Sequence, residues 1–208
     1  RTIALDLPNF GRSGRIPTHD VDSYGAYVVS FIEEVVGGAV SLVGHSLGGA
    51  VAMSVACGHP ELVSRLMLVD SAPIEGLVTP PEHYPIIEAY REDEAQLRPA
   101  LKTMVPQLTD EAFFDELVAD SRRMKGEAYV GHAEELGKAD FRDKASEYPG
   151  PVVFVRGGQD WLVTEDMARR TAAAFNGAVW QYPDVGHSLM VEDPAQFVEA
   201  VSRFVAEE

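Results

Sequence analysis

The chain has 208 residues with 33 acidic and 17 Lys or Arg side chains, so its formal charge is −16 and its pI lies near 4.7. This charge argues against a nucleic-acid partner, because phosphate backbones bind basic surfaces. Hydrophobic residues make up 46% of the chain and charged residues 24%, which excludes disordered, collagen-like and disulfide-rich classes. Cys57 is the only cysteine, and the longest apolar run is too short for a transmembrane helix. We therefore expect one globular domain in the cytoplasm, without a membrane span.

Short apolar runs alternate with helical patterns over most of the chain. In chain order we predict a strand at 2–7, a helix from Tyr24 to Gly37, a strand at 39–43, a helix at 48–59 and a strand at 66–70. After a long gap follow a strand at 152–156, a helix at 165–175, a strand at 178–182 and a helix at 194–206. Uniformly apolar strands are typical of a parallel sheet with both faces buried. The predicted fold is therefore α/β, with a mostly parallel sheet covered by helices on both faces.

Between residues 73 and 149 the patterns are helical only, and this stretch holds 17 acidic and 9 basic residues. Helices are predicted at 86–104, from an N-cap at Thr109 to Met124, and at 127–136. We interpret residues 73–149 as an all-helical insertion into a core formed by residues 1–72 and 150–208. The alternative is that these are ordinary helices of a crossover between two parallel strands. The length of the stretch argues against this, because a crossover requires only about a dozen residues.

The strand at 39–43 runs into the sequence Gly-His-Ser-Leu-Gly at residues 44–48, a Gly-x-Ser-x-Gly pattern between a strand and a helix. A sharp turn here would push the Ser46 hydroxyl out of the sheet edge, and glycine on either side would let the strand and the helix pass closely. The helix N-terminus favours negative charge, so the Leu47 amide is predicted to stabilise an oxyanion. The pattern predicts that Ser46 is a nucleophile, with a merely structural serine as the alternative.

A serine nucleophile needs a general base and an acid that orients the base. Asp160 and His187 each follow one of the last two predicted strands. Because parallel strands end at the same edge of a sheet, both side chains are expected beside Ser46. His187 would take the hydroxyl proton, Asp160 would fix the imidazole, and the acyl group would pass through an ester on Ser46. Asp70 is a rival acid, although an Asp before Ser-Ala-Pro more often caps a turn.

Four stretches of the chain are similar to the α/β-hydrolase superfamily. They are DLPNFGRS at 6–13, GHSLGG at 44–49, GGQD at 157–160 and GHS at 186–188. In such proteins the serine of the Gly-x-Ser-x-Gly turn, called the elbow, is the nucleophile. The acid follows the penultimate strand, and the base follows the last strand. The resemblance implies these roles for Ser46, Asp160 and His187, and it equates the helical insertion with that family's cap. It leaves the substrate open, because the same triad serves esterases, lactonases, carbon–carbon bond hydrolases and perhydrolases.

Two features depart from the family's pattern. Asn9 stands where relatives commonly have glycine, which Asn can replace because it tolerates a left-handed backbone. The family's first strands, with the loop that supplies a second oxyanion amide, have no counterpart before residue 2. The third of these missing strands would lie between the strands at 2–7 and 39–43. The predicted sheet therefore lacks a strand at that position. Either a longer natural chain supplies this segment, or the two flanking strands pair directly. In the second case the oxyanion lacks one amide donor, and the enzyme is expected to have low activity.

Apolar side chains near the predicted site are candidates for lining a substrate pocket. They follow the predicted acid or base, or lie in the helical insertion: Trp161, Val163, Leu189, Phe113, Phe114, Met124 and Tyr129. His45 is expected to pack beneath the nucleophile instead of acting as a base. The other four histidines lack metal-ligand spacing, so the sequence predicts neither a metal nor another cofactor.

The sequence therefore predicts a serine hydrolase that cleaves a small carboxylic ester or a related acyl substrate. One alternative is an enzyme of the same fold that hydrolyses a lactone or a carbon–carbon bond, or a perhydrolase. A second alternative is a ligand-binding member of the fold without catalytic activity. The acidic surface favours neutral or weakly polar substrates. Composition and motifs do not determine the oligomeric state.

Overall fold

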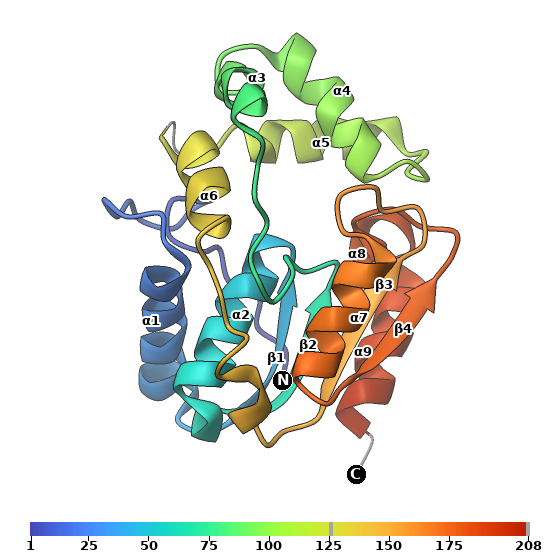
Figure 1. Ribbon diagram of the computed structural model, residues 1–208. Helices are drawn as coiled ribbons and strands as arrows, with labels where there is room; N and C mark the ends of the chain where they lie inside the picture. The colour runs from blue at the N-terminus through green and yellow to red at the C-terminus, as the bar shows by residue number, and fades with distance from the viewer. Residues whose placement is uncertain (125–126, 207–208) are drawn as a thin grey trace.

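The structure is a computed structural model that describes residues 1–124 and 127–206 (Figure 1). Its sheet has four strands in the order β1-β2-β3-β4, and every neighbouring pair is parallel. The strands are β1 (Val40–His45), β2 (Val63–Val69), β3 (Val152–Gly157) and β4 (Ala178–Tyr182). The carboxyl ends of all four strands therefore meet at one edge of the sheet.

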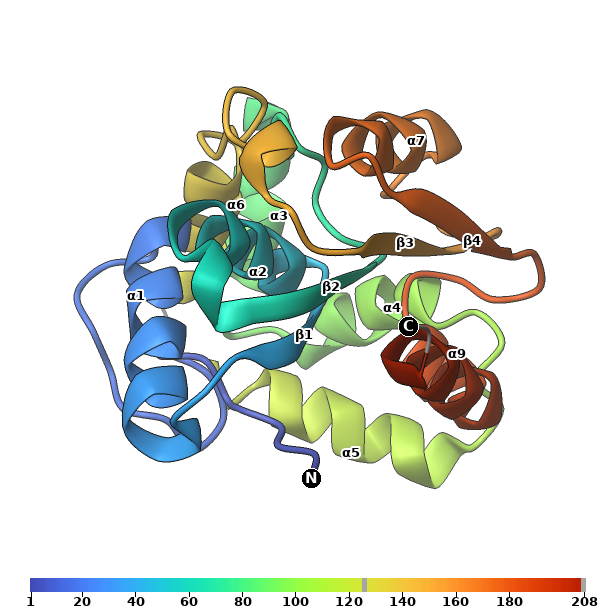
Figure 2. The ribbon, with the colours of Figure 1, turned by 90° about the horizontal axis from the view of Figure 1, so that it is seen from below.

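Helices cover both faces of this sheet, as Figure 2 shows from below. One face carries α1 (Val21–Phe31), α2 (Leu47–Gly58) and α7 (Glu165–Ala174), and the other carries α8 (Leu189–Glu192) and α9 (Pro194–Ala206). Alternate side chains of β2 enter different cores: Leu66 and Leu68 pack with α2, while Met67 and Val69 pack under α9. The predicted α/β fold with a parallel sheet covered on both faces is confirmed.

The chain between β2 and β3 contains helices but no strand among the described residues. These helices are α3 (Tyr84–Ala89), α4 (Glu94–Met104), α5 (Glu111–Ser121) and α6 (Ala128–Leu136). They lie above the carboxyl edge of the sheet (Figure 1). Single 3-10 turns occur at Pro60–Leu62, Pro81–His83 and Ala145–Glu147. The predicted insertion at 73–149 and the core at 150–208 include residues 125–126 and 207–208, which lie outside the described residues.

Two helix predictions in this stretch are wrong in detail, and an aspartate explains each. The helix predicted at 86–104 is two helices, because Asp93 caps a new one by accepting a hydrogen bond from the Ala95 amide. The next helix is capped by Asp110, whose carboxylate accepts from the Phe113 amide at 3.0 Å, and not by Thr109. A carboxylate at the cap also interacts favourably with the helix dipole.

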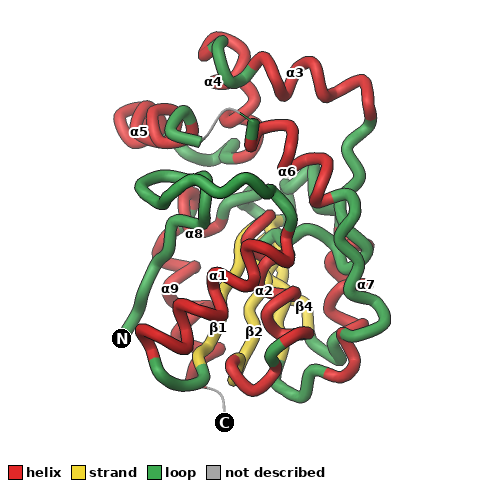
Figure 3. The backbone as a smooth tube through the Cα atoms, turned by 90° about the vertical axis from the view of Figure 1, so that its left-hand side faces the viewer, coloured by secondary structure: helices red, strands yellow, loops and turns green. Residues whose placement is uncertain are grey.

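Residues 1–7 form no strand, so the strand predicted at 2–7 is wrong. Figure 3 draws this segment as a loop, and its Ile3 and Leu5 side chains are 40% and 44% exposed. A strand forms where a neighbouring strand supplies hydrogen bonds, and apolar composition alone does not provide that neighbour. The segment does not pair directly with β1 either. In the described sheet β1 is an edge strand, and its Val43 side chain is 38% exposed.

A buried hydrogen-bond network holds the segment that follows residue 7. Asn9 has a left-handed φ of 71°, which agrees with its predicted tolerance of this conformation. Its Nδ2 donates to the Tyr24 hydroxyl at 2.9 Å and to the Thr18 carbonyl at 3.1 Å. Its Oδ1 accepts from the Ile16 amide at 3.0 Å. The Tyr24 hydroxyl is also 2.7 Å from Nε2 of His132 in α6, so Asn9 supports the tyrosine that joins α1 to α6, which a glycine could not do.

The helix predicted from Tyr24 begins three residues earlier, at Val21, because Asp20 caps it through the Ser23 amide at 2.7 Å. Its last turn is a π-helix, Ile32–Val36, and it ends at Gly37 with a φ of 73°. The predicted glycine stop is therefore confirmed. Within residues 1–124 and 127–206, no helix combines the length and the apolar character that crossing a bilayer requires.

Candidate active site

Ser46 occupies a strained turn between β1 and α2. Its φ is 52° and its ψ is −120°, a backbone conformation that is costly for a residue with a side chain. The turn is fixed by three hydrogen bonds: the Ser46 amide donates to Val69, and its carbonyl accepts from Gly49 and Ala72, at 2.9 to 3.2 Å. Leu47 is the first residue of α2, so helix geometry leaves its amide without an intrahelical acceptor.

The glycines around Ser46 differ in their steric role. A Cβ atom on Gly44 would lie 2.3 Å from the Gly48 carbonyl oxygen, so only glycine fits at the end of β1. A Cβ atom on Gly48 would meet nothing within 4 Å, and the expectation that this position must lack a side chain is wrong. The close approach falls one residue later, because a Cβ atom on Gly49 would lie 2.1 Å from Oγ of Ser71.

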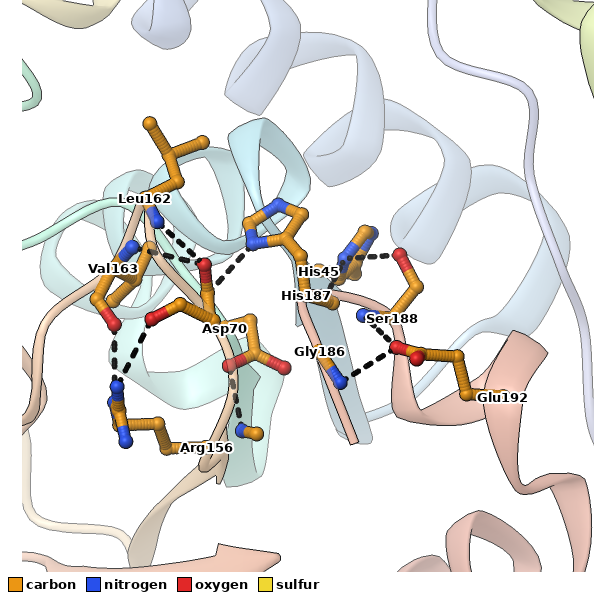
Figure 4. Close-up of polar contacts among 11 residues, drawn as sticks. His45, Asp70, Arg156, Leu162, Val163, Gly186, His187, Ser188 and Glu192 are labelled. Atoms are coloured by element: carbon orange, nitrogen blue, oxygen red, sulfur yellow. Dashed lines mark hydrogen bonds and ion pairs between the residues drawn. The ribbon is translucent and has the colours of Figure 1, made fainter. Parts of the chain in front are cut away.

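Asp160 and His187 form a buried hydrogen-bonded pair. His187 Nδ1 is 2.8 Å from Asp160 Oδ2, and each residue is 5% exposed. The other carboxylate oxygen accepts from the Leu162 amide at 2.8 Å and the Val163 amide at 3.1 Å (Figure 4). Burial opposes ionisation, but these hydrogen bonds, with the one from His187 the largest, hold the pKa of Asp160 below its ordinary value of 3.8. An ionised Asp160 assigns the proton to Nδ1 and leaves the Nε2 lone pair of His187 able to accept one.

Two glycines let the loops that carry Asp160 and His187 come together. A Cβ atom on Gly157 would lie 1.7 Å from the Gly186 carbonyl oxygen. On the adjacent Gly158, it would lie 2.5 Å from Cα of Pro183. Backbone hydrogen bonds also join the two loops, at 2.7 Å from Gly158 to Tyr182 and at 2.9 Å from Gln159 to Val185. Glycine is therefore needed at positions 157 and 158 because a side chain at either would clash with the loop that carries His187.

Arg156 supports the loop that carries Asp160. Its guanidinium donates to the Val163 carbonyl at 3.0 Å through Nε and to the Asp160 carbonyl at 3.1 Å through Nη2. The side chain is 6% exposed, near the carboxyl end of β3. Sequence reasoning missed this role; the only available signal is a charged residue at the end of an apolar strand.

His45 connects the elbow to the loop of His187. The two imidazole centroids are 4.9 Å apart, and His45 Nε2 is 2.8 Å from the His187 carbonyl oxygen. Burial, and then the neighbouring His187, lower the pKa of His45 to about 4, so the ring is neutral at pH 7. Because a carbonyl only accepts, Nε2 of His45 carries the proton and cannot act as a base. This agrees with the packing role expected for His45.

The structure does not join Ser46 to His187 by a hydrogen bond in the part of the chain that it describes. It places Ser46 next to His45, whose ring lies against His187, at the same edge of the sheet. Such contacts are often long in the absence of substrate and tighten when it binds.

Asp70 is a second buried carboxyl group beside Asp160. Its Oδ1 accepts from the Gly157 amide at 2.8 Å, and no donor among the described residues reaches its buried Oδ2. Burial, reinforced by the charge of Asp160 and opposed by the Gly157 hydrogen bond, raises the pKa of Asp70 to about 9. Asp70 is therefore protonated at pH 7. The contact with His187 is made by Asp160 and not by this rival acid.

The side chains predicted to line a pocket occupy different environments. Val163 and Leu189 are at most 1% exposed and pack in the two cores of the sheet. Phe114 is also buried, between α4 and α5, and Tyr129 is buried with its hydroxyl donating to the Ser121 carbonyl. The more exposed members of the predicted set are Trp161, Phe113 and Met124. Within the described residues, no three His, Cys, Asp or Glu side chains are grouped to hold a metal ion.

A parallel sheet with helices on both faces and a serine on a strained strand-to-helix turn is the arrangement of α/β hydrolases. Residues 1–200 match the family model described as the alpha/beta hydrolase family, and the chain belongs to this family.

Particular relatives support the same assignment. The chain is 27% identical over 221 residues to the sn-1-specific diacylglycerol lipase ABHD11 of Danio rerio, with 99% of this chain and 69% of the relative covered. It is 29% identical over 223 residues to the 2-hydroxy-6-oxo-6-(2'-aminophenyl)hexa-2,4-dienoic acid hydrolase of Metapseudomonas resinovorans, with 99% and 74% covered. Among solved structures, the esterase EaEST from Exiguobacterium antarcticum superposes with a TM-score of 0.88 at 19% identity, covering 97% of this chain and 80% of the esterase.

Proposed function

We propose that this chain is a serine hydrolase that cleaves a carboxylic ester or a related small acyl substrate. His187 takes the Ser46 hydroxyl proton while the serine oxygen attacks the acyl carbon, and Asp160 stabilises the imidazolium that forms. The alcohol leaves with that proton, and water then hydrolyses the ester on Ser46 by the same route. The Leu47 amide stabilises the oxyanion. The observation that carries the proposal is the buried 2.8 Å contact of His187 Nδ1 with Asp160, which leaves Nε2 as the base.

The surroundings of the site favour a neutral substrate. The net charge of −16 opposes the approach of an anionic one. We place α3 to α6 as a cap over the site, with the exposed Trp161 and Phe113 side chains as apolar contacts for the acyl group. The relative named as a diacylglycerol lipase acts, by its name, on an ester, which supports this substrate class. The chemistry needs no cofactor.

The second candidate is hydrolysis beside a ketone, with cleavage of a carbon–carbon bond. It is favoured by the relative named as a hydrolase of a 2-hydroxy-6-oxo-dienoic acid, whose substrate carries an oxo group. The same serine and base would serve both reactions, so the substrate decides between them.

Parallel assays of p-nitrophenyl butyrate and a β-diketone test the proposal on the purified chain. We expect release of p-nitrophenol above the buffer rate and, after acid quench, a butyryl group on the peptide that contains Ser46. The diketone is expected to react more slowly. Faster cleavage of the diketone would favour the second candidate, and no reaction with either substrate would contradict a hydrolytic function.

A further inference from the structure

Glu192, at the end of α8, accepts hydrogen bonds from the backbone amides of two separate segments. Its Oε1 accepts from the Gly186 amide at 2.8 Å and from the Ser188 amide at 3.5 Å, the two residues that flank His187 (Figure 4). Its Oε2 accepts from the amide of Gln107 at 2.9 Å. Hydrogen bonds to a carboxylate are stronger than those between neutral groups, so this side chain joins the segments firmly.

Gln107 belongs to the loop that follows α4 in the helical insertion, and the last residue of α4 contacts His187 itself. The His187 amide donates to the Met104 carbonyl at 3.0 Å. A Cβ atom on Gly186 would lie 2.4 Å from Cδ of Pro106, so the Gly186 backbone packs closely against the Pro106 ring. On the opposite side, the His187 carbonyl accepts from His45. The backbone of His187 is thus held between the elbow and the insertion, with Glu192 as the charged link.

We propose that Glu192 is a positioning residue that fixes the His187 loop and couples it to residues 104–108. This inference rests on the proposed function, in which His187 is the base. Glu192 does not reach the reacting atoms; it acts by setting the position of the imidazole relative to Ser46. A displacement of about 1 Å at a reacting group lowers a rate by up to about 100-fold, so a loosened loop has a measurable cost.

The substitution Glu192→Gln tests the link with little change in shape. Its single carbonyl oxygen can accept from Gly186 or from Gln107, while the new NH2 group faces the other N–H as a second donor. One of the two hydrogen bonds is therefore lost. Asp193→Asn is the matched control, because it removes the same charge one residue away. The Asp193 carboxylate caps α9 by accepting from the backbone and side-chain amides of Gln196, and within the described residues it makes no hydrogen bond to residues 183–188.

Two readouts separate positioning from general destabilisation. In Glu192→Gln we expect kcat for p-nitrophenyl butyrate to fall about tenfold with KM within about twofold, since the substrate contacts are unchanged. Hydrogen exchange should accelerate at the Gly186 and Gln107 amides. Asp193→Asn should leave kcat and both exchange rates as in the parent chain. Glu192→Ala, which lacks both oxygens, should lower kcat further than the Gln variant.

Unchanged exchange at Gly186 and Gln107 in Glu192→Gln would overturn the inference. So would a loss of kcat equal to that of the Asp193→Asn control. A parent chain that hydrolyses no ester would refute the proposed function instead, and the exchange data would then decide alone whether Glu192 fixes the loop. Faster exchange confined to residues 104–108 and 183–193, with kcat lowered, supports it.

Discussion

Replacing His187 with Gln is expected to lower kcat for p-nitrophenyl butyrate by about 10⁴-fold or more. The Gln side chain still fills much of the space and can contact Asp160, but it cannot accept the Ser46 proton at neutral pH. KM should change little, because the imidazole contributes to the transition state and not to substrate binding. Steady-state kinetics with a tight background correction measure the effect.

His59→Gln is the control for this substitution, because the His59 side chain is exposed to solvent and, within the described part of the chain, lies 3.6 Å from Glu61, far from the candidate site in sequence. It should retain the activity of the parent chain. A His187→Gln variant that keeps more than about a tenth of the activity would show that another group is the base.

Replacing Asp160 with Asn should lower kcat by about 10³- to 10⁴-fold without unfolding the chain. The Asn oxygen can keep the hydrogen bonds from Leu162 and Val163, so the NH2 group would face Nδ1 of His187. That donor makes Nδ1 an acceptor and moves the imidazole proton to Nε2, where a base needs a lone pair. Steady-state kinetics and circular dichroism measure activity and folding in the same samples.

Asp70→Asn is the matched comparison and should keep most of the activity, because Asn resembles the protonated carboxyl group in shape and hydrogen bonding.

The Asp70→Asn substitution should also change the dependence of stability on pH. The pKa of Asp70 in the folded chain, about 9, lies above the ordinary value of 3.8. Between these two pH values the folded chain therefore keeps a proton that the unfolded chain has released. Stability from this group is complete below about pH 4 and is lost as the pH rises toward 9. In urea titrations the variant should therefore gain stability over the parent at pH 8 and lose that gain toward pH 4. Activity lost in Asp70→Asn but kept in Asp160→Asn would reassign the acid.

Periodicity and turn residues predicted the core of this fold well, for local reasons. β3 is an apolar run between Pro-Gly and Gly-Gly, and the prediction at 152–156 differs from the structure by one residue. The contact of Asp160 with His187 was expected because parallel strands end at one edge, and the structure has it at 2.8 Å. Residues 2–7 show the limit of this reasoning, since an apolar run becomes a strand only beside a partner.

The features that sequence reasoning missed depend on contacts between distant segments. Glu192 and Gln107 are 85 positions apart, and neither shows a motif that would pair them. Asn9 was expected only to tolerate its backbone conformation, whereas its side chain donates to the Tyr24 hydroxyl, which in turn contacts His132 in another helix. Gly49, and not Gly48, is the glycine that lies against Ser71, which follows β2 by two residues. None of these pairings leaves a periodic signal in the sequence.

The central claim is that the imidazole at residue 187 activates the hydroxyl at residue 46. Reaction of the chain with a fluorophosphonate, followed by peptide mapping in a mass spectrometer, tests this most directly. We predict one adduct, on Ser46, that forms in the parent chain and is nearly absent from His187→Gln. An adduct on a different residue, no adduct at all, or equal labelling of Ser46 in both chains would contradict the account.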